Sequence, residues 1–182
     1  MGLTLISSHT ASSDATLDIT SGIDSTYNEY QFQLVNMHPA TDKVDFLVQF
    51  NAASGSNTTG FDQKIVSTAF YVQHGEGDGA GSSIDYQVNF DQGQGTGYQA
   101  LNYEVGNNTD QSVSGILTLY DPSSTTYVKH FMTRTANAQG DDYFVDWYTA
   151  GYINTTSAID EISFMFDSGN IDAGTIYMYG VS

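Results

Sequence analysis

The strongest constraint on the fold is an alternation of apolar and polar side chains with a period of two residues, which is typical of half-buried β-strands. It is clear in residues 43–51, where one side of the strand holds Val44, Phe46, Val48 and Phe50. A shift of one residue would turn all four apolar groups to water, so the register of this strand is strongly specified. Residues 27–37 alternate in the same way.

The same alternation organises residues 158–182. Ile162, Phe164 and Phe166 share one parity, residues 167–170 supply turn formers, and the following residues alternate between apolar side chains and tyrosines. Two alternating runs joined by a short turn are typical of a β-hairpin. We therefore predict that a C-terminal hairpin closes the sheets.

Ten or more such runs follow one another at the spacing of a sandwich, and no segment of convincing length has the helical period. The chain has 182 residues, shows no second composition and has no long linker, which favours one domain. We predict an all-β fold of two antiparallel sheets packed face to face as a β-sandwich with jelly-roll connections. Residues 14–182 are expected to form this domain, and residues 1–13 an N-terminal arm or edge segment.

The chain is strongly acidic: 21 Asp and Glu stand against 4 Lys and Arg, which gives a formal net charge of −17. A surface of this charge repels phosphate groups and anionic lipids and cannot release counterions from nucleic acid. We therefore expect neither nucleic acid nor a membrane among the partners. The chain has no cysteine, which excludes disulfides and thiolate metal sites.

Metal and cofactor sites are not indicated by the sequence. The four histidines do not stand at a metal-ligand spacing; they are His9, His38, His74 and His130. The glycine-rich residues 74–83 include Glu76 and Asp78 and could wrap a calcium ion, but they lack the residue order of a dedicated calcium loop, which favours a hairpin tip. We predict no metal and no cofactor.

Catalytic machinery is not indicated either. The chain has no nucleophile elbow and no phosphate-binding loop. Asp142 and Asp146 share a strand face but lie about 13 Å apart along an ideal strand, which is too far for a glycosidase pair. Asp160 and Glu161 are adjacent and so point to opposite faces. We therefore predict no catalytic residue and no enzymatic activity.

Aromatic residues are abundant, with 13 Tyr, 10 Phe and 1 Trp. We assign the phenylalanines and the inward tyrosines to the core. Tyrosines on the solvent side suit a protein interface or the stacking of sugars, and the interface is the simpler interpretation. The candidate surface-contact residues are Tyr148, Tyr152, Tyr177 and Tyr179.

Four segments carry a resemblance to a known class of proteins. Residues 168–180 (SGNIDAGTIYMYG) form the ending of the pattern, which extends through residues 22–42, 121–132 and 148–160. This pattern resembles β-sandwich virion structural proteins of tailed bacteriophages, especially those of marine and cyanobacterial hosts. The shared motifs are turns and strands without catalytic content, so the resemblance carries over no catalytic residue.

The resemblance implies a non-enzymatic structural protein located in the virion. Such a protein would be a capsid decoration (cement) or tail-fibre and appendage component that acts by self-association as a homo-oligomer, for which a trimer is one option. It would also dock on major capsid or tail proteins. The alternative is a receptor- or carbohydrate-binding module of a tail fibre, in which Trp147 and exposed tyrosines stack on host surface glycan. A polysaccharide depolymerase is a third, weaker alternative.

Overall fold

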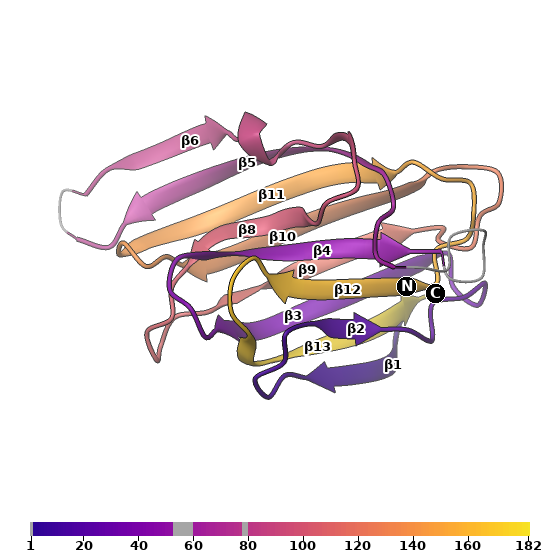
Figure 1. Cartoon of the computed structure of the whole chain (residues 1–182), viewed down its shortest axis with the longest axis horizontal. Helices are drawn as coiled ribbons and strands as arrows, with labels where there is room; N and C mark the ends of the chain where they lie inside the picture. The colour runs from indigo at the N-terminus through magenta and orange to yellow at the C-terminus, as the bar shows by residue number, and fades with distance from the viewer. Residues whose placement is uncertain (1, 53–59, 78–79) are drawn as a thin grey trace.

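The structure is a computed structural model that describes residues 2–52, 60–77 and 80–182. It consists of two antiparallel sheets packed against each other, as the alternation of apolar and polar residues predicts (Figure 1). The all-β sandwich is thus confirmed, whereas the jelly-roll connectivity stays a prediction. In the described part of the chain the single helical element is a short 3₁₀ turn, and no helix there has the length and apolar character needed to span a membrane.

Thirteen strands and one 3₁₀ turn are present in the described residues. They are β1 (Leu3–Thr10), β2 (Leu17–Ile19), β3 (Glu29–Pro39), β4 (Val44–Asn51), β5 (Ile65–Gly75), β6 (Ser82–Tyr86), η1 (Val88–Phe90), β7 (Gly93–Gly95), β8 (Gln99–Val105), β9 (Val113–Tyr120), β10 (Lys129–Ala138), β11 (Tyr143–Ile153), β12 (Glu161–Phe166) and β13 (Ile171–Val181).

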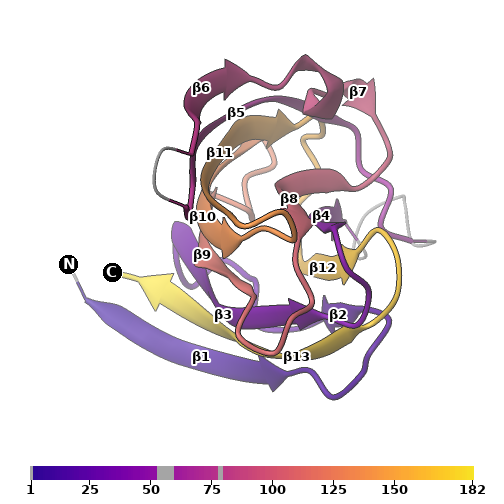
Figure 2. The same ribbon diagram turned by 90° about the vertical axis from the view of Figure 1, so that its left-hand side faces the viewer.

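The two sheets differ in size. The large sheet has nine strands in the order β1-β13-β3-β9-β10-β11-β5-β6, with β7 also paired to β5, and the small sheet has four in the order β2-β12-β4-β8. Figure 2 shows the large sheet as an arc that curves around the small sheet. The inner face of the large sheet is therefore concave and covered, and its outer face is convex.

The main core fills the space between the sheets. Phe46 on β4 stacks on Phe164 of β12 with ring centroids 6.0 Å apart, and the ring of Phe166 lies 5.0 Å from that of Phe46. Phe32 of the large sheet meets Phe164 from the opposite side at 6.1 Å. These side chains are fully buried, which confirms the inward faces that the alternation predicts for these strands.

A second, smaller aromatic cluster lies under the β5–β11 end of the large sheet. Trp147 is fully buried there between Tyr71, Tyr103 and Phe90, with ring centroids 5.2 to 5.9 Å from its own. Its indole Nε1 donates a hydrogen bond to Thr149 Oγ1 at 2.7 Å, so the one polar atom of the indole is satisfied. In this region β8 and η1 cover the inner face of the large sheet.

The predicted C-terminal hairpin is wrong. β12 pairs with β2 and β4 in the small sheet, whereas β13 pairs with β1 and β3 in the large sheet, so the turn at 167–170 crosses from one layer to the other. The predicted faces are nevertheless correct, because Phe164 and Met178 are both fully buried. Their strands point apolar side chains at the same core from opposite sheets.

The N-terminal segment lies at the edge of the large sheet. Residues 3–10 form β1, which runs antiparallel to β13 with Leu3 opposite Val181 and Thr10 opposite Thr175. Gly2 and Ser182 exchange two backbone hydrogen bonds of 2.9 and 3.0 Å beside this ladder. The two ends of the described chain are thereby joined (Figure 1).

The outer face of the small sheet is polar and partly covered by loops. Gln49 points away from the main core, opposite to Val48 and Phe50, yet it is fully buried. Its Nε2 donates to the carbonyl oxygens of Gln63, Thr96 and Gly97 at 3.2, 3.1 and 2.8 Å, and its Oε1 accepts the amide of Phe50. This side chain fastens two loops onto the small sheet.

Candidate interaction surface

The four tyrosines predicted as surface contacts all project from the outer face of the large sheet and are half-buried. Tyr148 and Tyr152 lie on β11, and Tyr177 and Tyr179 lie on β13. Three strands separate the two pairs, a distance of about 19 Å at the usual strand spacing. The structure therefore places the four side chains on one face but gathers them into two separate pairs.

Tyr148 belongs to a ladder of stacked planar groups that crosses the strands. Its ring is parallel to that of Phe70 on β5, with centroids 4.7 Å apart and 2° between the planes. The guanidinium carbon of Arg134 on β10 lies 5.2 Å from the centroid of Tyr148. Register places Phe70 on the other side of Tyr148 from Arg134, so both faces of the tyrosine ring are occupied and only its edge meets solvent.

An ion pair stands beside this ladder. Arg134 donates from Nε and Nη2 to the two carboxylate oxygens of Asp146 at 3.0 and 2.8 Å, and the Tyr148 hydroxyl donates to Oδ2 at 3.0 Å. The hydrogen bond from Arg134 lowers the pKa of Asp146, with partial burial opposing it, and the hydrogen bond to Asp146 raises the pKa of Tyr148. Charge is thus balanced within the ladder.

Large apolar side chains surround the ladder on β5, β6, β9, β10 and β11, and each is more than a third exposed. They are Phe70, Val72, Ile84, Tyr86, Ile116, Met132 and Phe144. We call these residues, with Tyr148, the outer patch. Exposed apolar side chains gathered on one face of a folded domain are typical of interaction surfaces, which makes the outer patch a candidate.

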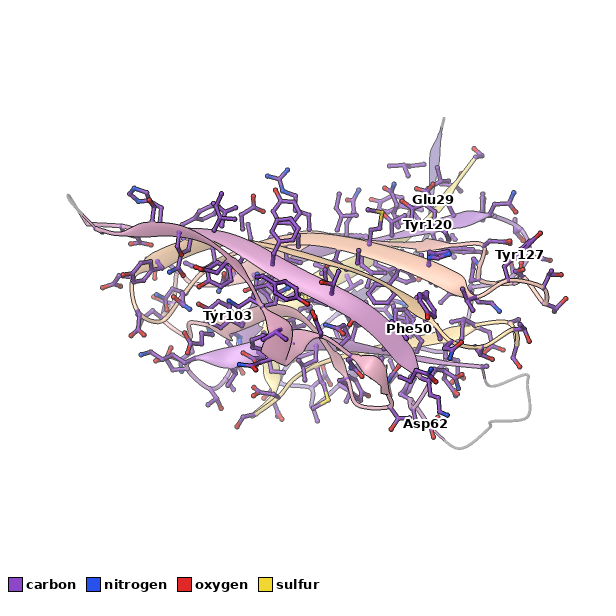
Figure 3. The ribbon with its side chains drawn as sticks, turned by 90° about the horizontal axis from the view of Figure 1, so that it is seen from above. Glu29, Phe50, Asp62, Tyr103, Tyr120 and Tyr127 are labelled. Atoms are coloured by element: carbon purple, nitrogen blue, oxygen red, sulfur yellow. The ribbon has the colours of Figure 1, made fainter. Side chains whose placement is uncertain are left out.

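The outer patch is shallow. Two hollows of about 400 Å³ each lie on it, one beside Ile116 and Phe144 and the other beside Met132 and Tyr152. Figure 3 shows the sheet edge-on, with Tyr120 of β9 standing on the side away from Phe50 and Tyr103. A convex, shallow and apolar surface suits contact with another protein better than enclosure of a small molecule.

The outer patch carries few charged side chains. In the five strands that form it, the acidic residues are Asp85 and Asp146, and register turns Asp85 to the inner side opposite Tyr71. Asp146 is paired with Arg134, and at the margin of the patch the carboxylate of Asp91 accepts a hydrogen bond from the hydroxyl of Tyr86. In a chain with a net charge of −17, this low density of charge distinguishes the outer patch.

The sequence analysis missed the apolar members of the outer patch. Phenylalanines were assigned to the core, but Phe70 is 43% and Phe144 51% exposed. Phe144 has the parity of Tyr148 and Tyr152 along β11, opposite to that of the buried Trp147. Strand parity was thus the signal that could have found it.

The proposed use of Trp147 as a sugar-stacking residue is wrong. Its side chain is fully buried in the second aromatic cluster, where three aromatic rings surround it. Its parity along β11 turns it inward, away from Tyr148. No glycan could reach this ring in the folded chain.

A further hollow, of about 470 Å³, lies on the outer face of the small sheet next to residues 89–98. Asp45 and Asp167 line it. Burial raises the pKa of Asp45 to about 6, and the nearby charges of Asp167 and Glu104 act in the same direction, while the Glu104 amide that donates to Asp45 Oδ1 at 3.1 Å opposes the shift. The hollow is therefore anionic at neutral pH, unlike the outer patch.

The other residues considered as metal ligands or acids are dispersed. Within residues 2–52, 60–77 and 80–182, no three His, Asp or Glu side chains lie close enough together to hold a metal ion. Asp78 of the glycine-rich loop lies outside the described residues. Asp146 has a lowered pKa because of Arg134, whereas a general acid in a glycosidase needs a raised one.

Comparison with known proteins gave no relative. No family model, curated protein or solved structure matches the chain.

Proposed function

We propose that this chain is a non-enzymatic structural protein of a tailed-phage virion, where it forms a capsid decoration or a tail appendage. The observation that carries the proposal is the outer patch, a broad apolar surface that the fold leaves uncovered and that carries few charged side chains. Exposed apolar area of this kind on a soluble domain is retained for contact with a partner. The resemblance of residues 22–42, 121–132, 148–160 and 168–180 to virion proteins supports the assignment to a phage particle.

The partner at the outer patch is a capsid or tail protein with an uncharged apolar surface. A cationic partner would be drawn to the acidic remainder of the chain rather than to the patch. Exposed edges of aromatic rings, as in Phe70 and Tyr148, favour edge-to-face contacts with rings of a partner. The proposal therefore includes docking on the particle together with self-association.

The glycan-binding alternative has weaker support. Sugar stacking needs a free ring face, and both faces of Tyr148 are occupied, by Phe70 and Arg134. Trp147 is buried, and the outer face is convex (Figure 2). Saturable binding of the chain to host-cell glycan, lost on replacement of Tyr152 or Tyr179, would instead favour this alternative.

Immunogold electron microscopy of intact phage particles tests the location. Label over the head would support decoration, and label on the tail or its fibres would support an appendage. Unlabelled particles would reject the virion proposal.

Co-sedimentation of the purified chain with particles that lack it tests the surface. A variant with Phe144→Ser and Met132→Ser is expected to lose saturable binding, because the two side chains are half-exposed and lie on either side of Tyr148 within the outer patch. The control is Tyr127→Ser, since Tyr127 is 71% exposed but lies in the 121–128 loop (Figure 3). Equal binding of both variants would reject the outer patch as the docking surface.

A further inference from the structure

β1 leaves one side of the large sheet without a partner. It is the last strand of the sheet order and pairs only with β13 in the described structure (Figures 1 and 2). An unpaired strand edge is a template for the addition of another strand. This edge gives a location for the self-association included in the proposed function, and the inference below rests on that part of it.

The backbone groups at this edge can be identified. Gly2 and Ser182 exchange both of their hydrogen bonds, so they form a hydrogen-bonded pair of the antiparallel ladder. Because such pairs alternate with pairs whose groups point outward, the N–H and C=O of Leu3 and Leu5 point away from β13. A second strand could accept and donate hydrogen bonds at these two residues.

The side chains at this edge do not block a second strand. The strand Leu3–Thr10 contains no Asp, Glu, Lys, Arg or Pro. Leu3 and Leu5 are 51% and 53% exposed. Proteins usually protect an edge strand with charge or proline. The opposite edge, β6, is shorter and contains Asp85.

We infer that two copies of this chain associate through β1, which pairs with β1 of the second copy in antiparallel orientation about a twofold axis at Thr4. In this register Leu3 of each copy lies opposite Leu5 of the other, and both residues exchange two backbone hydrogen bonds. The leucine side chains then form two contacts on the same face. The bulge between Leu5 and Ser7 ends the straight part of the edge and confines the pairing to residues 2–5.

A second copy fits this edge better than an unrelated segment for two reasons. Antiparallel pairing of one segment with itself is self-complementary, as a twofold interface requires. In addition, each copy has a net charge of −17, and two such molecules approach at least cost where neither carries a charge. Residues 2–10 are such a segment, with His9 as their one titratable side chain.

A single-cysteine variant tests the register, because the chain has no cysteine of its own. Thr4 would face Thr4 of the second copy in a non-hydrogen-bonded pair, with Cα atoms roughly 4.5 Å apart, which suits a disulfide. T4C is therefore expected to form a covalent dimer under mild oxidation about tenfold faster than S82C, an exposed control on the β6 edge, since pairing raises the local thiol concentration. Equal rates would overturn the inference.

Sedimentation of the uncrosslinked chain provides a second test. L3P removes an N–H that points away from β13, so the fold is kept while the dimer is expected to weaken about tenfold. Raising NaCl from about 0.05 to about 0.5 M should strengthen the wild-type dimer by screening its net charge. A monomeric wild type, or no effect of L3P, would refute the β1 pairing. These measurements use the purified chain, so labelled particles with a monomeric chain would reject this inference alone.

Discussion

The outer faces of the two sheets differ in the polarity of their side chains. On the small sheet, the buried amide of Gln49 holds two loops through hydrogen bonds, and the partly buried carboxylate of Asp45 accepts the Glu104 amide of the neighbouring strand β8. On the large sheet, exposed apolar groups such as Phe144 and Met132 have no covering segment in the described structure. The polar side chains of the small sheet make hydrogen bonds within the chain, whereas the apolar side chains of the large sheet are left exposed, and we propose that a partner contacts them.

Replacement of Gln49 is expected to give the largest effect on stability. Gln49→Ala removes the donor for three loop carbonyls and leaves a buried gap, so the free energy of unfolding should fall by about 3 kcal/mol. Urea unfolding measures the change. The matched control is Gln31→Ala on the outer face of the large sheet, which should cost less than about 0.5 kcal/mol. Similar losses for both variants would contradict the comparison.

Asp45 should make the small-sheet face sensitive to pH. Its folded pKa of about 6 lies above the ordinary value of 3.8, so the folded state binds the proton more tightly and loses stability as the pH rises through this window. Asp45 is only partly buried, so solvent reduces the free-energy cost of its negative charge in the folded state. We therefore expect Asp45→Asn to stabilise the fold by about 1 kcal/mol at pH 8 and by almost nothing at pH 3.5.

Urea unfolding of wild type and Asp45→Asn at the two pH values measures this difference. Asparagine keeps an oxygen that can accept the Glu104 amide, so the contact is preserved. Asp110→Asn, at an exposed position, serves as the control. A gain that is equal at both pH values would show that the charge of Asp45 is not its cause.

Replacement of outer-patch residues should affect binding more than stability. Phe144 is half-exposed, and Phe144→Ser is expected to change the free energy of unfolding by at most about 1 kcal/mol while it weakens attachment to particles. Urea unfolding and co-sedimentation of the same protein preparation separate the two quantities. A loss of several kcal/mol would show that the patch belongs to the core after all.

The Arg134–Asp146 pair should contribute least. The Arg134 side chain is 67% exposed, so its coupling to Asp146 is expected to be smaller than any effect above and to decrease as NaCl is added. A double-mutant cycle with Arg134→Gln and Asp146→Asn measures this coupling. A coupling that does not change with salt would indicate a buried pair.

Strand faces could be predicted from the sequence, but strand partners could not. The alternation around Phe164 and Met178 correctly turned both side chains inward. It could not show that β12 and β13 lie in different sheets, because two strands of one hairpin and two strands facing each other across a core have the same pattern. The C-terminal hairpin was therefore a reasonable but wrong pairing.

The candidate surface was likewise predicted only in part. Parity placed Tyr148 and Tyr152 on the solvent side, and the structure places both on the outer face. Phe70 and Phe144 were assigned inward on residue type alone, although both share the outward parity. Whether the outward face of a sheet is covered by a further layer depends on how the whole chain packs, and a local pattern does not contain this information.

The ladder between β1 and β13 also has a kinetic consequence. Thr10 and Thr175, whose hydroxyls lie 3.0 Å apart across this ladder, are separated by 165 residues along the chain. During synthesis β1 leaves the ribosome early and has no native neighbour until almost all remaining strands have been made. Because closing so long a loop costs conformational entropy, we expect the β1–β13 ladder to form after the pairing of neighbouring strands such as β9, β10 and β11. β1 is thus synthesised before the other strands of the sandwich, and its only neighbour in the described structure, β13, is synthesised last.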